Sequence, residues 1–170
     1  MNEVLSRWNL LPAEAAEREI VACCGSRSWA RGIAKRRPLA DQGAVFAAAD
    51  DVSRTLGRSD WLEAFRSHPR IGGAKADESS GARCEAWSRE EQGQAAQAGG
   101  TARQALAEGN RAYEEKFGHL FIVCATGKSA GEILEILGRR LQNEQEAEFS
   151  EAREQQRQIT QLRLAKWLAT

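Results

Sequence analysis

Apolar side chains recur every three or four residues along most of the chain, which is the spacing of one face of an α-helix. The first long stretch follows Pro12, which suits the first turn of a helix, and is closed by Gly25, which suits a helix end. A later stretch is closed by Gly118 in the same way. The pattern predicts long helices over 13–24, 26–35, 40–56, 101–117, 129–141 and 144–168.

Serine residues predict where three helices begin. Ser59 precedes a short apolar stretch and is expected to cap a helix there with its hydroxyl. Ser88 and Ser129 are each followed three residues later by a glutamate, Glu91 and Glu132, which is the spacing of a capping box. Each of these serines is therefore expected at the N-terminus of a helix.

Two stretches depart from the helical pattern. Residues 70–86 are rich in glycine and serine and poor in apolar residues, which predicts a long irregular loop. Residues 120–125 are apolar, and both a buried extended piece and the start of a core helix fit them. The predicted fold class is all-α: a single domain over 1–170, with about seven or eight helices, one long irregular loop and one short extended segment.

The composition is that of an ordinary globular protein, with 42% hydrophobic and 28% charged residues in a chain of 170. Lys and Arg number 24, as do Asp and Glu, so the net charge of zero gives no electrostatic reason to expect a nucleic-acid or membrane partner. Residues 1–14 lack the apolar core of a signal peptide. The 4 cysteines show no CxxC spacing, which favours reduced thiols. A cytoplasmic protein is expected.

Two histidines are candidates for chemistry. His68 lies where a predicted helix meets the glycine-rich loop, and Pro69 after it stiffens the backbone beside the ring. The structural alternative is a solvent-exposed histidine or one that caps the helix end, and it is favoured for an isolated histidine. The fixed backbone and the loop beside His68 shift the balance toward function. His119 follows Gly118 and is expected to be such a cap. A zinc site from these histidines with Cys84 and Cys124 lacks ligand spacing, so no metal is expected.

Two charged residues have both a structural and a functional interpretation. Glu91 is either the acidic half of the Ser88 capping box or a carboxylate placed at a helix N-terminus near bound ligand, and the sequence alone favours the capping role. Arg163 lies between two leucines, and the sequence alone favours a surface arginine over one paired inside a cleft.

Several short motifs, each weak alone, occur together in an order that resembles the decarboxylases of 2-oxo-4-hydroxy-4-carboxy-5-ureidoimidazoline (OHCU). The resemblance covers nearly the whole chain. One departure is Leu39, where phenylalanine is common in the family. The motifs are Leu10-Leu11-Pro12, Cys23-Cys24-Gly25-Ser26, Trp29-Ala30, Arg37-Pro38, His68-Pro69-Arg70-Ile71-Gly72, Trp87-Ser88-Arg89-Glu90-Glu91-Gln92, 110–113 with Lys116-Phe117-Gly118, 121–127 and 159–166.

This resemblance implies an all-α lyase that releases CO₂ from OHCU to give (S)-allantoin, the last step of urate degradation to allantoin. It implies a homodimer that needs no cofactor or metal. By the family's pattern the catalytic residues are His68, Glu91 and Arg163. The residues expected to contact substrate are Pro69, Ser88, Arg89, Glu90, Glu91, Gln92, Phe121, Ile122, Val123, Cys124 and Ala125.

Two other functions remain open at this point. A related ureido or imidazoline hydrolase would use an activated water and usually a metal ion. A helical interaction module without catalysis would have little need of an irregular loop around a histidine, which weighs against it.

Overall fold

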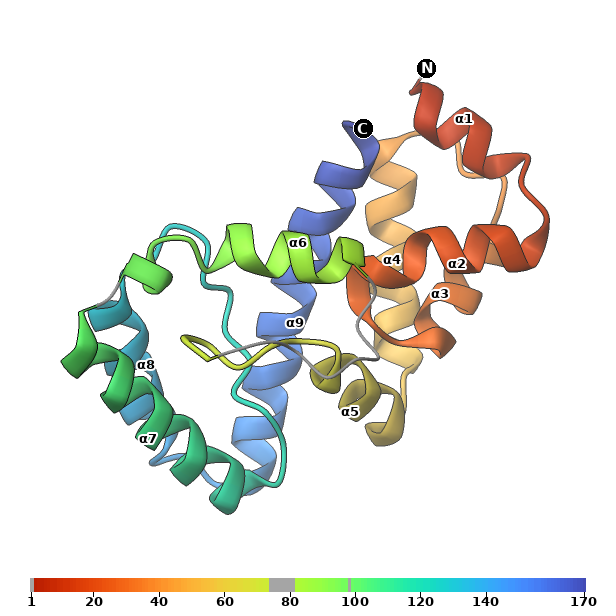
Figure 1. The fold of residues 1–170 in the computed structure, drawn as a ribbon. Helices are drawn as coiled ribbons and strands as arrows, with labels where there is room; N and C mark the ends of the chain where they lie inside the picture. Colours follow the sequence, from red (N-terminus) through yellow and green to blue (C-terminus); the bar gives the residue numbers. More distant parts are fainter. Residues whose placement is uncertain (1, 74–81, 98) are drawn as a thin grey trace. The chain divides into compact units, whose positions relative to one another are not determined.

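The computed structural model describes residues 2–73, 82–97 and 99–170 of the chain, and these are helical with no β-strand (Figure 1). The all-α prediction is confirmed. The helices are α1 (Glu3–Asn9), α2 (Ala13–Cys24), α3 (Arg27–Ala34), α4 (Gln42–Thr55), α5 (Arg58–Arg66), α6 (Ala82–Glu91), the 3₁₀ turn η1 (Ala95–Gln97), α7 (Gly100–Phe117), α8 (Ala130–Arg140) and α9 (Gln145–Leu168).

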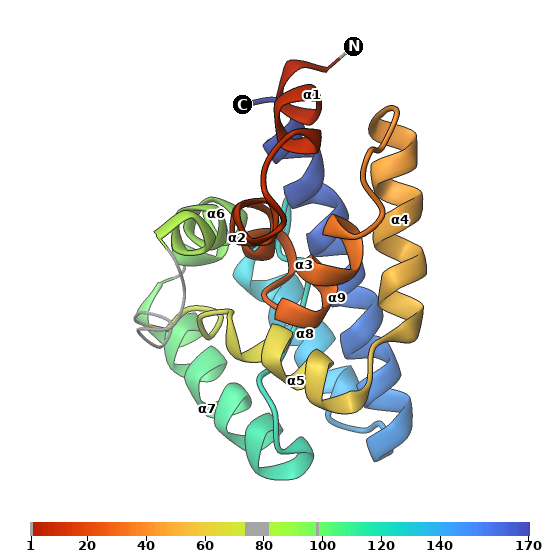
Figure 2. The ribbon, with the colours of Figure 1, turned by 90° about the vertical axis from the view of Figure 1, so that its right-hand side faces the viewer.

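The chain forms two compact units. Unit 1 comprises residues up to 64 together with 157–170, and unit 2 comprises 65–156, so that α9 begins in unit 2 and ends in unit 1. In unit 1, α3 packs against both α2 and α4 (Figures 1 and 2). The indole rings of Trp8 and Trp167 meet edge to face there, with centroids 5.5 Å apart.

Unit 2 is built around the pair α7 and α8, which pack against each other (Figure 1). The predicted amphipathic face of α7 is buried as Leu106, Asn110, Tyr113 and Phe117. Aromatic rings at the end of this face surround the imidazole of His119. The core of the unit consists of Ile71, Ala95, Leu106, Tyr113, Phe117, Phe121, Val123, Ala125, Ala130, Ile133 and Leu137.

Most of the predicted helix boundaries are confirmed. Gly25 and Gly118 end α2 and α7 with φ angles of 91° and 74°, the left-handed conformation that glycine adopts without strain. Ser129 forms the predicted capping box with Glu132 at the start of α8. The helix α1 was not predicted, because its 7 residues are too few to show a clear period.

Two of the predicted helix starts are wrong. Ser59 lies inside α5, and the N–H of Gly57 is bound instead by the Asp60 carboxylate at 3.0 Å. Ser88 lies in the middle of α6, which begins at Ala82. The predicted irregular loop over 70–86 is therefore helical from 82 onward. Its residues 74–81 lie outside the part of the chain that the structure describes.

The apolar stretch 120–125 is neither helix nor strand. All the side chains of 121–125 are buried, with at most 7% exposed. The choice that periodicity left open is thus decided in favour of a buried, non-helical segment, which connects α7 to α8.

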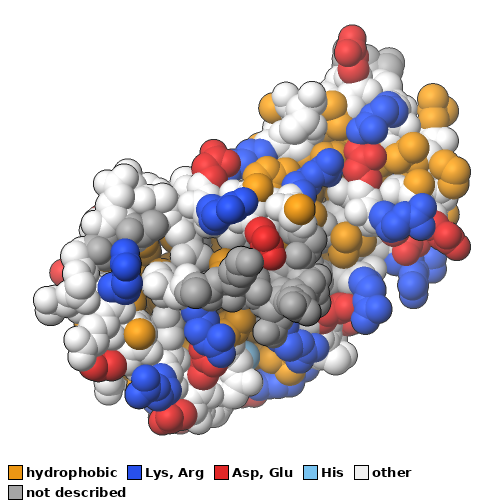
Figure 3. All heavy atoms as spheres, viewed as in Figure 1, with side chains coloured by type: hydrophobic (Ala, Val, Ile, Leu, Met, Phe, Trp, Pro, Cys, Tyr) orange, Lys and Arg blue, Asp and Glu red, His pale blue; other side chains and the backbone are white. Residues whose placement is uncertain are grey.

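Charged side chains of both signs are interspersed on the face drawn in Figure 3, as expected for a chain with no net charge. Among the described residues, every helix is too short or too polar to cross a lipid bilayer.

Candidate active site

His68 is a buried histidine, which contradicts the solvent-exposed alternative. It follows α5, and its backbone N–H donates to the Phe65 carbonyl at 3.2 Å. Only 8% of the residue is exposed, and its Nε2 lies 2.8 Å from Oε1 of Gln156 on α9. Pro69, half-buried, fixes the backbone immediately after it. The imidazole is therefore held in one orientation by a residue 88 positions away.

Helix α6 lies against the stretch that follows His68. Near its start, the Cys84 thiol donates to the carbonyl of Ser67 at 3.5 Å. Just beyond its end, Oε1 of Gln92 accepts a hydrogen bond of 3.3 Å from the backbone of Gly72. These two contacts fasten both ends of α6 to the backbone on either side of the histidine and its proline.

The buried face of α6 is polar. Its buried residues are Cys84, Ser88 and Glu91, which are spaced to lie on one side of the helix, while Arg89 and Glu90 are exposed. Of the residues predicted to contact substrate, Ser88 and Glu91 are therefore buried, whereas Arg89 and Glu90 lie on the exposed side of the helix.

Glu91 lies at the C-terminal end of α6, and both expectations for it are corrected. It is not half of a capping box, because Ser88 is inside the helix, and it is not at a helix N-terminus. The negative end of the helix dipole disfavours a carboxylate at this position, and burial adds a desolvation cost. Glu91 is 9% exposed, so both of these costs apply to its carboxylate.

The segment 121–125 is held by side chains rather than by a β-ladder. Nη1 of Arg140 donates to the carbonyl of Ile122 at 2.6 Å, and Oε1 of Gln155 accepts from the N–H of Cys124 at 2.8 Å. Lys128 Nζ adds a bond to the Cys124 carbonyl at 2.8 Å. Because Gln155 is adjacent to Gln156, consecutive residues of α9 bind this segment and His68.

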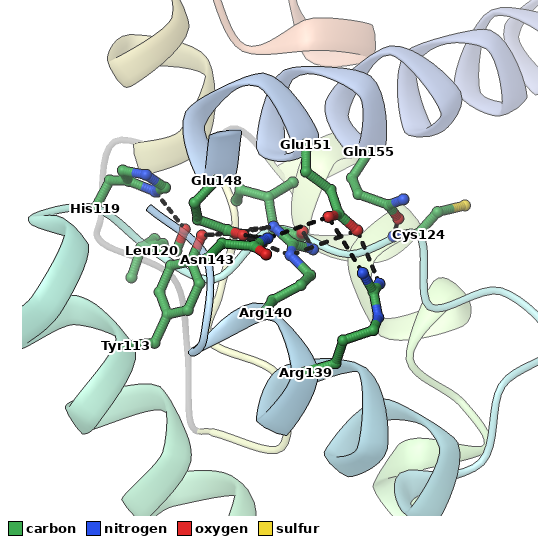
Figure 4. A network of polar contacts seen from close by, with 11 residues as sticks. Tyr113, His119, Leu120, Cys124, Arg139, Arg140, Asn143, Glu148, Glu151 and Gln155 are labelled. Carbon is green, nitrogen blue, oxygen red and sulfur yellow. Dashed lines mark hydrogen bonds and ion pairs between the residues drawn. The ribbon is translucent and has the colours of Figure 1, made fainter. Parts of the chain in front are cut away.

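The arginine that holds the segment belongs to a buried polar network (Figure 4). Arg140 and Glu148 are both fully buried and form an ion pair in which Nη2 and Oε1 are 2.5 Å apart. The Tyr113 hydroxyl donates to the same carboxylate, and Asn143 Nδ2 donates to its other oxygen at 2.8 Å. Burial and the bond to Glu148 raise the pKa of Tyr113, so the phenol stays neutral and remains a donor.

Sequence reasoning missed Arg140, Glu148, Gln155 and Gln156. One signal was available for the first of them. Arg140 lies on the face of α8 that buries Ile133 and Leu137, where an apolar residue was expected. A charge in such a position is buried only when it is paired.

Arg163 belongs to unit 1, and its surface interpretation is wrong because the residue is fully buried. Its Nη1 donates to the Ala22 carbonyl at 3.2 Å. Next to it, burial raises the pKa of the Cys24 thiol to about 11, although Ser26, Thr160 and the charge of Arg163 oppose the rise. His68, Ser88, Glu91 and the 121–125 segment belong to unit 2, so Arg163 is the one predicted site residue in the other unit.

His119 is a core residue rather than a helix cap. Gly118 provides the cap of α7, and Nδ1 of His119 lies 2.9 Å from the Leu120 carbonyl. Its ring packs near those of Phe65 and Tyr113, with centroids 5.2 and 5.5 Å away. Within 2–73, 82–97 and 99–170, three or more potential metal-ligating residues nowhere come together as a metal site.

Comparison with known proteins matches residues 9–165 to the OHCU decarboxylase family. The uric acid degradation bifunctional protein TTL of Arabidopsis thaliana is 36% identical over 153 residues. The match covers 90% of this chain and 47% of that protein, so the chain spans about half the length of this curated relative.

Solved structures agree on the fold. A crystal structure of an OHCU decarboxylase in the presence of (S)-allantoin has a TM-score of 0.77 and 34% identity, covering 89% of this chain and 98% of that one. An (S)-allantoin synthase structure has a TM-score of 0.70 and 18% identity, covering 96% of this chain and 53% of that one, and it supports the fold alone. The extent of the family match shows that this chain belongs to the OHCU decarboxylase family.

Proposed function

We propose that the chain is a decarboxylase that converts OHCU to (S)-allantoin and CO₂ without a cofactor, the last step of urate degradation to allantoin. The observation that carries the proposal is the buried His68, held at 2.8 Å by Gln156 and followed by Pro69, in a chain of this family. The ring of His119 bonds the adjacent Leu120 carbonyl and packs among aromatic rings, whereas the ring of His68 is tied to a distant helix beside the proline of the family motif.

The reaction needs an electron sink, and the substrate contains one. When the bond to the carboxylate breaks, its electron pair moves into the conjugated C=N and carbonyl system of the ring, and CO₂ leaves. One proton is then delivered to a ring carbon, which becomes the (S) centre of allantoin. The protein therefore has to orient the substrate, stabilise the charge that develops, and protonate one face.

His68 is assigned the proton transfer. An imidazole changes its protonation near neutral pH without extreme tuning, and the bond from Nε2 to Gln156 limits how the ring can turn. A fixed ring delivers its proton to one face of the substrate only. This gives the stereochemical outcome as well as the rate.

Glu91 is assigned to substrate binding: its carboxylate accepts hydrogen bonds from the ureido or ring N–H groups of the substrate. A second effect is repulsion of the substrate carboxylate. This like-charge repulsion vanishes as CO₂ departs, so it raises the ground state relative to the transition state. Ser88, one turn earlier on the buried face of α6, and Gln92, which binds Gly72, complete this side of the site.

Arg163 is assigned the cationic partner of the reaction, on the strength of the family resemblance and its fully buried guanidinium. A salt bridge to the departing carboxylate would stabilise the ground state and slow the reaction. We therefore assign the guanidinium to a substrate oxygen that becomes negative in the transition state.

The substitution Arg163→Lys tests this role, because it keeps the charge and loses the planar guanidinium. We expect kcat to fall at least about tenfold, on the scale of one charge-assisted hydrogen bond. Unchanged kinetics would exclude this role.

The experiment is an assay with freshly generated OHCU. Its decay is followed by absorbance against the spontaneous background, and the handedness of the allantoin formed is followed by circular dichroism. We expect faster decay and an excess of (S)-allantoin. Decay at the background rate with racemic product would contradict the proposal. His68→Asn is expected to lose turnover by about 10²- to 10⁴-fold while it still binds allantoin.

Three further properties are proposed with the function. The two units act together as one domain over residues 1–170. The chain forms a homodimer, which light scattering of the purified protein tests directly. It acts in the cytoplasm, in keeping with four buried cysteines that form no disulfide within the described residues.

A further inference from the structure

Residues 121–125 are buried, yet the structure pairs only part of their backbone. The described residues supply partners to the carbonyl of Ile122 and to both backbone groups of Cys124. The Ala125 carbonyl is bound by the N–H of Lys128 at 3.0 Å. No residue in the described part of the chain hydrogen-bonds to the N–H or the C=O of Val123, which is only 4% exposed.

This pattern follows from the geometry of an extended chain. Successive residues direct their backbone groups to opposite sides, so Ile122 and Cys124 share one edge and Val123 lies on the other. The first edge is held by Arg140 and Gln155, from α8 and α9 (Figure 4). Buried backbone groups are nearly always paired. Phe121, Val123 and Ala125 share the second edge, and neither backbone group of Val123, at its centre, is paired within the described chain, so this edge is open to a ligand.

The anchor at Ile122 is rigid because of what surrounds it. Glu148 accepts from Arg140 Nε at 2.9 Å and from Nη2 at 2.5 Å, which leaves Nη1 directed at the Ile122 carbonyl at 2.6 Å. The guanidinium also lies over the Phe121 ring, 4.7 Å from its centroid. Because the Glu148 carboxylate fixes one side of the planar Arg140 guanidinium, the other side fixes the position of the Ile122 carbonyl.

We propose that Arg140 and Gln155 are positioning residues for the decarboxylation: by binding Ile122 and Cys124 on one edge of the segment, they direct the backbone of Val123 on the other edge toward the substrate. The inference rests on the proposed function. Neither side chain touches the substrate. Both act through the backbone, which supplies neutral hydrogen-bond donors to an oxygen that becomes negative in the transition state.

The test uses Gln155, because its single neutral contact can be removed without leaving a buried charge. Gln155→Met keeps the length of the side chain and removes the acceptor for the Cys124 N–H. We expect kcat on OHCU to fall about 3- to 10-fold with little change in KM, because the lost interaction acts in the transition state. Gln155→Glu keeps an acceptor oxygen and is expected to restore most of kcat.

Gln145→Met is the matched control. Gln145 lies on the same helix, and its amide also binds a backbone group, the Lys116 carbonyl at 2.5 Å, but it does not contact the segment. We expect wild-type kcat from this variant. A loss equal to that of Gln155→Met would reduce the effect to general damage to α9 and overturn the proposal.

The contribution of Arg140 is tested with its partner neutralised as well. The double substitution Arg140→Met with Glu148→Gln removes the bond to Ile122 and leaves no unpaired buried charge. Arg139→Met is its control, because Arg139 is exposed and pairs with Glu151 at 2.9 Å without reaching the segment. We expect kcat to fall about tenfold in the first variant and to stay unchanged in the second.

Amide hydrogen exchange without substrate separates the possible failures. Gln155→Met is expected to speed exchange at Cys124 at least about tenfold while exchange in α7 stays as in the wild type. If the wild-type chain accelerates OHCU decay and Gln155→Met is equally active, the positioning role is wrong and the proposed function stands. If the wild-type chain does not accelerate the decay, the proposed function fails, and the positioning role fails with it.

Discussion

Helices α3 and α6 have similar lengths, 8 and 10 residues, and bury opposite kinds of side chain. The buried residues of α3 are Trp29, Ala30, Ile33 and Ala34, whereas α6 buries Cys84, Ser88 and Glu91. Burial of the first set releases apolar surface from water and stabilises the fold. The second set includes a hydroxyl and a carboxylate, whose burial costs desolvation that hydrogen bonds have to offset. We propose from this contrast that α3 serves the fold and α6 serves the chemistry.

The largest effect is expected in α3. Trp29 is fully buried, and Trp29→Ala should lower the free energy of unfolding by about 3–5 kcal/mol, because it removes apolar contact and leaves a cavity. Chemical denaturation measures this. Trp29→Phe is the control, since it keeps a ring and removes an indole N–H that no described residue accepts. An alanine variant as stable as the wild type would remove the contrast.

The second largest effect is expected from alkaline pH, which should lower the free energy of unfolding through the Cys24 thiol, just before α3. The pKa of Cys24 is raised from 9.0 to about 11 in the folded chain, so the folded state holds this proton more tightly than the unfolded state. The stabilisation is complete below pH 9 and is lost as the pH rises toward 11, by up to about 3 kcal/mol. Denaturation at several pH values measures it. Cys24→Ala should flatten the dependence between pH 9 and 10, because Tyr113, whose pKa is also raised from 10.0, contributes only above that range. An unchanged slope between pH 9 and 10 would contradict this.

Glu91→Gln tests α6 directly. We expect kcat to fall about 10- to 100-fold, the scale of one hydrogen bond to a charged group, because the carboxylate is assigned to the substrate. The free energy of unfolding is expected to change less, since glutamine keeps the size of the side chain and removes a charge at the negative end of the helix dipole. Parallel kinetics and denaturation give both numbers. Loss of stability with full activity would make the glutamate structural.

The smallest effects come from two serines. Ser26 caps α3, and its hydroxyl accepts from the Trp29 N–H at 3.3 Å, so Ser26→Ala should cost about 1 kcal/mol of stability. Ser88 lies inside α6 and caps no helix, so Ser88→Ala is expected to lower kcat rather than to remove a cap. An unchanged kcat in Ser88→Ala would contradict the assignment of this serine to the site.

The helices with an apolar buried face were predictable from the sequence, whereas the start of α6 was not. The helices around Val45, Tyr113 and Ile133 were recognised because their periodicity is local, and Gly118 and Ser129 ended or began helices as their residue types predict. Ser88 misled for the opposite reason. Its capping motif is valid in isolation, but α6 begins at Ala82, six residues before Ser88, and local propensity is a weak signal that the surrounding structure can override.

By itself the sequence determined the helical class, most helix boundaries, and the family through its ordered motifs. It singled out His68 and Glu91 but not their surroundings. Only the tertiary structure decided that Gln156, 88 residues away, fixes the imidazole, and that Arg140 and Gln155 hold the segment before α8. Helix formation depends on neighbours within four residues, whereas these contacts join residues whose separation leaves no period in the chain.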